Sequence, residues 1–169
     1  MIEDDIDIVD SNVFKKFIDT AKTFNVGHMN WNTLPLVEHN PTYTIINNDG
    51  ISIDISFRIC GCFSYFTYNA LQYCGLINDK QFVNALEHVE HAYRMSLMKF
   101  APPFYAFPCI TNCSAYLKDC GEQSTIDHSS DLYKQRLATA YSTFKHMYGK
   151  TLAELPIPTV DEVKQYFIS

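Results

Sequence analysis

Residues 51–59 alternate strictly between apolar and polar side chains, and this pattern constrains the fold more than any other in the chain. An apolar residue at every second position places one face of a β-strand on a core. The segment 42–46 before it is rich in β-forming residues, and the residues between them, Asn47-Asn48-Asp49-Gly50, tolerate a positive φ. The pattern therefore predicts a β-hairpin over about 42–59. Because an isolated hairpin is only marginally stable, we expect it to lie on helices or to gain a third strand, with residues 5–9 as the candidate.

Two consecutive segments predict a helical hairpin. Asn78 and Gln81 have the spacing of a capping box, and Pro102 can stop the helix that follows. Residues 62–74 also have apolar side chains at helical spacing, so an αα-hairpin is expected over 62–100. The apolar stripe of its second helix would consist of Phe82, Leu86, Val89, Tyr93, Leu97 and Phe100.

Helical spacing and end signals predict four more helices, at about 11–24, 108–121, 129–149 and 159–167. Residues 28–41 show no clear period and are expected to form a loop. The predicted fold class is therefore α+β and mainly helical. A single β-hairpin (about 42–59) would pack on five or six helices, including the αα-hairpin (62–100), in one globular domain spanning 1–169.

Composition excludes several classes of protein. Hydrophobic residues make up 47% of the 169 residues, and the net charge is only −6, which argues against a disordered chain. No window of about 18 consecutive apolar residues predicts a membrane span, and the acidic first ten residues do not resemble a secretory signal. Arginine occurs only three times, so nucleic acid is not expected as a main partner. We expect a cytoplasmic protein or one held within a virion or another assembly. Ile, Asn, Lys, Phe and Tyr are plentiful while Arg, Gly and Pro are modest, a bias often found in AT-rich genomes that favours a virus, a phage or an AT-rich microbe as the source.

The six cysteines are expected to be reduced and mostly buried, because no export signal is visible and no CxxC motif occurs. No cofactor is expected on this interpretation. The alternative is a zinc site, since three thiols and an imidazole can form a tetrahedral ligand set. Its ligands would be Cys109, Cys113, Cys120 and His128.

The segment Glu87-His88-Val89-Glu90-His91 carries the residue types of a helical metal site, but the ExxH and HExxH spacings are absent. Helical periodicity directs His88 and His91 away from the apolar stripe. We therefore expect this segment to be a solvated face, with a subunit interface as its more plausible functional use.

Familiar catalytic motifs are missing. The chain has no Cx5R phosphatase loop, no GxSxG elbow, no GxxxxGK phosphate loop and no GxGxxG dinucleotide motif. A small enzyme with a Cys/His active site stays as an alternative. Its base would come from His28, His39 or His128, each in an expected loop.

Aromatic residues are abundant, with 11 Tyr and 12 Phe. The loop 102–108 is the most apolar in the chain, and aromatic side chains are enriched at interfaces. Phe104, Tyr105 and Phe107 are therefore the predicted contact residues. The function expected is a non-enzymatic, protein–protein interaction or structural subunit of a larger assembly that binds other subunits or itself. The alternatives are the small Cys/His enzyme and a zinc-stapled adaptor module.

Overall fold

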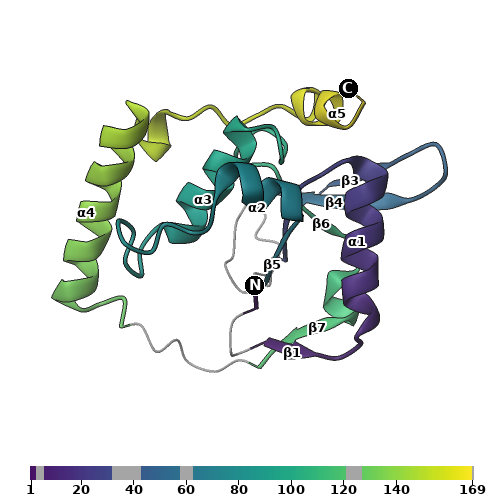
Figure 1. Cartoon of the computed structure of the whole chain (residues 1–169), viewed down its shortest axis with the longest axis horizontal. Helices are drawn as coiled ribbons and strands as arrows, with labels where there is room; N and C mark the ends of the chain where they lie inside the picture. The colour runs from purple at the N-terminus through teal and green to yellow at the C-terminus, as the bar shows by residue number, and fades with distance from the viewer. Residues whose placement is uncertain (3–5, 32–42, 58–62, 121–126, 169) are drawn as a thin grey trace.

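A computed structural model describes residues 1–2, 6–31, 43–57, 63–120 and 127–168 (Figure 1). Within these ranges the chain is α+β, with seven strands in three small antiparallel sheets and five α-helices. The prediction of a mainly helical fold with one hairpin is therefore wrong. The strands are β1 (Ile6–Ile8), β2 (His28–Trp31), β3 (Tyr43–Ile46), β4 (Ser52–Ser56), β5 (Phe63–Phe66), β6 (Phe107–Ile110) and β7 (Leu117–Asp119). The α-helices are α1 (Asn12–Phe24), α2 (Tyr68–Cys74), α3 (Glu87–Leu97), α4 (Asp131–Tyr148) and α5 (Val160–Ile168).

The predicted hairpin exists as β3 and β4, which pair with Ile46 opposite Ser52. Gly50 has a φ of 76°, the left-handed conformation that this turn requires. Ile53 and Ile55 are buried, as the alternation predicted. The third strand of this sheet is β6, however, and not residues 5–9.

Residues 108–121, expected to be a helix, instead contribute β6, a short 3₁₀ turn and β7. Pro108 suits the first turn of a helix but also an edge strand, where its missing N–H costs no ladder hydrogen bond. Among the described residues, β6 pairs with β4 alone. The N-terminal strand β1 pairs with β7, with Ile8 opposite Leu117.

The helical hairpin predicted over 62–100 is also wrong. The start of the predicted first helix instead forms β5, which pairs with β2. The strand β2, at His28–Trp31, lies in the segment that was expected to be a loop. The rest of the predicted loop lies outside the described residues. The helix α2 begins after β5, where the Thr67 hydroxyl caps it by accepting the Ala70 N–H. A run of aromatic residues such as Phe63 to Phe66 suits a strand as well as a helix, and only the pairing with β2 decides between them.

The predicted helix at 78–100 begins nine residues late, at Glu87. The capping contact itself forms, because Asn78 Oδ1 accepts the Gln81 N–H at 3.3 Å. The chain then turns at Asn84 and Leu86, which have φ values of 51° and 62°. A local capping contact therefore does not ensure that a helix continues from it.

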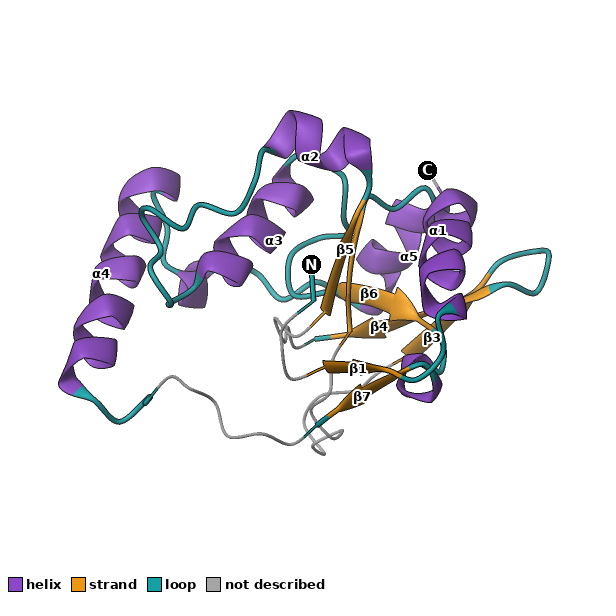
Figure 2. Cartoon of the chain, turned by 60° about the horizontal axis from the view of Figure 1, so that its bottom comes forward, coloured by secondary structure: helices purple, strands orange, loops and turns teal. Residues whose placement is uncertain are grey.

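The helix α3 lies at the centre of the molecule. Figure 2 shows the sheets with α1 and α5 on one side of it and α4 on the other. One core cluster joins α1 to the sheets through Val13, Phe17 and Met29. A second cluster joins α3 to α4 around Phe144, and a third joins α3 to α2 through Met95 and Ala70. No helix in the described part of the chain is both long and apolar enough to cross a membrane.

Three predicted helices are confirmed as α1, α4 and α5. In α4 the Ser130 hydroxyl accepts the Tyr133 N–H at 3.2 Å, and Gly149 ends the helix in the left-handed conformation. In α5 the capping box of Thr159 and Glu162 forms as predicted.

Replacing the cap of α4, Ser130→Ala, should lower the free energy of unfolding by about 1 kcal/mol, because a helix N–H loses its acceptor. Urea denaturation measures this loss. Thr139→Ala is the matched control, since the Thr139 hydroxyl only donates to the Gln135 carbonyl on the exposed face of the same helix. Equal losses for the two variants would contradict the capping role.

Candidate functional site

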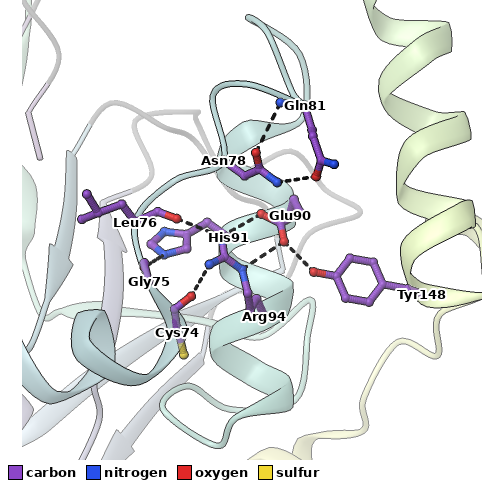
Figure 3. A network of polar contacts seen from close by, with 9 residues as sticks. All are labelled: Cys74, Gly75, Leu76, Asn78, Gln81, Glu90, His91, Arg94 and Tyr148. Carbon is purple, nitrogen blue, oxygen red and sulfur yellow. Dashed lines mark hydrogen bonds and ion pairs between the residues drawn. The ribbon is translucent and has the colours of Figure 1, made fainter.

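A buried carboxylate, Glu90, lies at the junction of α3 and α4. Its side chain is completely buried. Arg94, one turn later, donates Nε to Oε1 at 3.0 Å and Nη2 to Oε2 at 2.9 Å. The hydroxyl of Tyr148 on α4 donates to Oε1 at 2.5 Å (Figure 3). These bonds satisfy both oxygens of Glu90 and tie the end of α4 to α3.

The other side of α3 holds the turn that ends α2. Arg94 donates to the carbonyls of Cys74 and Leu76. His91 Nε2 lies 2.9 Å from the carbonyl oxygen of Gly75, so this nitrogen carries the proton and donates. The last carbonyls of a helix lack intrahelical partners. Side chains of α3 supply those partners here, as Figure 3 shows, and fix α2 against α3.

A pocket of about 660 Å³ opens beside this turn, and we call it the α2–α3 pocket. Its size and apolar character are those of a binding pocket. Its apolar lining includes Phe66, Leu71, Leu76, Ile77, Phe82 and Val83. Its polar lining includes Asp79, Asn84, Glu87, His88 and His91.

The histidines of the pocket favour the neutral form. Burial lowers the pKa of His91 and also that of His88, although Glu87 opposes the shift at His88. His88 Nε2 lies 3.9 Å from Glu87 Oε1. The lining residues that the structure describes include two carboxylates and no lysine or arginine, so the pocket has acidic character.

The chain has unusual backbone conformations where it passes from the pocket wall into α3. Asn84 lines the pocket, and both Asn84 and Leu86 are left-handed. Leucine rarely adopts this conformation, and such strain is concentrated at functional sites. The wall that leads into α3 is therefore a second reason to treat the pocket as the candidate site.

The predicted contact loop lies elsewhere. Phe104 and Phe107 are only 8% and 4% exposed and pack in the cluster around Phe144. Tyr105 is half-buried, and its hydroxyl donates to the Leu152 carbonyl at 2.8 Å. That this loop contacts a partner stays a prediction, but in the isolated chain its two phenylalanines offer little surface.

The structure does not assemble the predicted zinc ligands. Cys109 and Cys113 are both buried, and burial together with the neighbouring Cys113 raises the pKa of the Cys109 thiol. Cys120 is exposed, and His128 packs against Tyr133. Within the described ranges, no three His, Cys, Asp or Glu side chains are placed to hold a metal ion.

The predicted histidine bases are also dispersed. His28 is buried in β2, stacked on Phe66, with Nδ1 3.1 Å from the Tyr65 carbonyl oxygen. Burial lowers its pKa to about 3. His128 lies on the surface before α4, and His39 lies outside the described residues.

The prediction that residues 87–91 form a solvated face is wrong for two of them. Glu90 is fully buried, and His91 is 1% exposed. The prediction assumed that the helix buries one stripe, as an amphipathic surface helix does. In the structure α3 packs against α2 on one side and α4 on the other. The spacing of Glu90 and Arg94 did show that they could pair, but nothing in the sequence showed that the pair is buried.

Comparisons with known proteins give no relative. No family model matches the chain, and neither the curated proteins nor the solved structures contain a match.

Proposed function

We propose that this chain is a non-enzymatic binding subunit that associates with another protein through the α2–α3 pocket. An apolar side chain of the partner would enter the pocket. The observation that carries the proposal is the apolar rim around this hollow, where Leu76 is 75% exposed and Val83 is 45% exposed. Single exposed apolar residues are common, but an apolar rim around an apolar pocket is typical of an interaction site.

A protein suits this surface better than a small molecule. Outside the pocket lining, α2 carries a further exposed aromatic side chain, since Tyr73 is also largely exposed. Tyrosine is enriched in the buried parts of interfaces, and binding energy concentrates where an anchor side chain enters a pocket.

The chemistry of the lining favours binding over catalysis. Its described residues offer no hydroxyl or thiol nucleophile. The single N–H of the neutral His91 ring donates its hydrogen bond to the Gly75 carbonyl. The enzyme alternative therefore gains no specific support from this pocket.

A displayed library of random peptides, selected on the wild-type protein, tests the proposal. Selected peptides should bind at least about tenfold more weakly to Leu76→Asp, because a charge on the rim opposes burial of an apolar anchor. Fluorescence anisotropy measures the affinity. The melting temperature of this variant should stay near that of the wild type, since Leu76 is exposed.

The matched control is Ile157→Asp, which places the same charge at an apolar residue that is 73% exposed and outside the pocket lining. It should leave peptide binding unchanged. Selected peptides that bind both variants equally well would show that the α2–α3 pocket is not the contact surface.

A further inference from the structure

The charges around the α2–α3 pocket identify the chemistry of its partner; this inference rests on the proposed function. Asp79 and Glu87 both line the pocket, together with the apolar rim residues Leu76 and Val83. A side chain next to the partner's anchor would therefore meet one of these carboxylates.

Nearby cations offset the two carboxylates only in part. Arg94 is paired with Glu90 and also donates to the carbonyls of Cys74, at the end of α2, and of Leu76. Met1 also lines the pocket, and its terminal ammonium donates to the Ser64 carbonyl at 2.7 Å and acts as a single positive charge near His88, although burial lowers its pKa. Lys80 follows Asp79 in the chain but is not part of the lining.

The histidines of the pocket do not supply a positive charge at neutral pH. Burial lowers the pKa of His91, which favours its neutral form, and its Nε2–H donates to the Gly75 carbonyl. His88, beside Glu87, is likewise shifted toward the neutral form by burial. Negative charge thus dominates the wall, in agreement with the sign of the net charge of the chain.

We infer that the partner is a protein segment carrying a lysine or arginine beside the apolar residue that enters the pocket. Opposite charges across an interface raise the association rate and suppress wrong partners. Asp79 is exposed and Glu87 is partly exposed. Salt should therefore screen their attraction for the partner's cation.

The test uses the peptides selected on the wild-type protein. Their sequences should be enriched in Lys or Arg beside an apolar residue, compared with the unselected library. Their affinity should fall by at least about fivefold for the double variant Asp79→Asn/Glu87→Gln, a loss of about 1 kcal/mol. It should also fall as NaCl rises from about 0.05 to 0.5 M. The control is Asp49→Asn/Asp131→Asn, which removes the same charge from two exposed sites outside the pocket.

The outcomes separate this inference from the proposed function. The selected peptides could lack basic residues and bind Leu76→Asp more weakly than the wild type, yet bind Asp79→Asn/Glu87→Gln with unchanged affinity. That result would overturn the inference of a basic partner and leave the pocket as the binding site. Equal weakening by the control pair would also overturn it, because the effect would then come from overall charge. Selected peptides that bind Leu76→Asp normally would overturn the proposed function and this inference together.

Discussion

Arg94→Met should lower the free energy of unfolding by about 3–5 kcal/mol, measured by urea denaturation. The Glu90 carboxylate is completely buried, and without Arg94 it would have no cation beside it. A buried charge that has lost its partner is among the most destabilising features a substitution can create. The turn after α2 would also lose the donor that satisfies Cys74 and Leu76.

Two further variants show whether burial is the cause. Lys15→Met breaks a pair with the same i, i+4 spacing on the exposed face of α1, and it should cost less than about 1 kcal/mol. Tyr148→Phe removes one hydrogen bond to Glu90 and leaves the arginine in place, so it should cost an intermediate amount, about 1–3 kcal/mol. If Arg94→Met cost no more than Lys15→Met, burial would not be the reason that the Glu90–Arg94 pair matters for stability.

Acidification should destabilise the protein well before most carboxylates titrate, and His28 is the main reason. Burial lowers the pKa of His28 from 6.5 to about 3. Between these values the unfolded state binds a proton that the folded state does not. The stability contributed by His28 is therefore complete above pH 6.5 and is lost as the pH falls toward about 3. The loss should approach about 1.4 kcal/mol per pH unit. Chemical denaturation at a series of pH values from 7 to about 4.5 measures the slope.

The surroundings of His28 give no compensation for a positive charge. The Tyr65 carbonyl favours the proton, but His91, His88 and the terminal ammonium all disfavour it. Burial lowers the pKa of His91 and of His88 too, so both add to the slope with the same sign. His28→Phe keeps a ring against Phe66 and should flatten the pH dependence, whereas His128→Gln, at an exposed residue, should not. An unchanged slope in His28→Phe would assign the acid sensitivity to other groups.

The elements that could be predicted from the sequence are those whose signals are complete within a few residues. The hairpin β3–β4 contains its own turn, and α4 and α5 contain their own caps. Each of these segments makes its defining hydrogen bonds with near neighbours, so no distant segment is needed to interpret it.

The elements that were mispredicted depend on distant partners. Phe63–Phe66 becomes a strand because β2 pairs with it, and Phe107–Ile110 does so because β4 pairs with it. Strand propensity depends strongly on such context. The candidate site likewise depends on contacts between segments that are separated in the sequence. Asp79, Glu87 and His88 are visible in the sequence, but the pocket that unites them exists only because the turn after α2 is held against α3.

The pairing of β1 with β7 has a consequence for the order in which the chain acquires structure. Ile8 lies opposite Leu117, so more than a hundred residues must be synthesised after β1 before it can pair with β7. Closing so long a loop is entropically costly and slow, whereas β3 and β4 meet across a short turn. During synthesis the β3–β4 hairpin can therefore form early, whereas β1 has no strand to pair with until β7 has been synthesised. This final closure places Ile6 and Leu117 in the core with Val13 and Phe17. Shortened chains that stop before β7 would then keep the hairpin but leave one edge of the α1 core open.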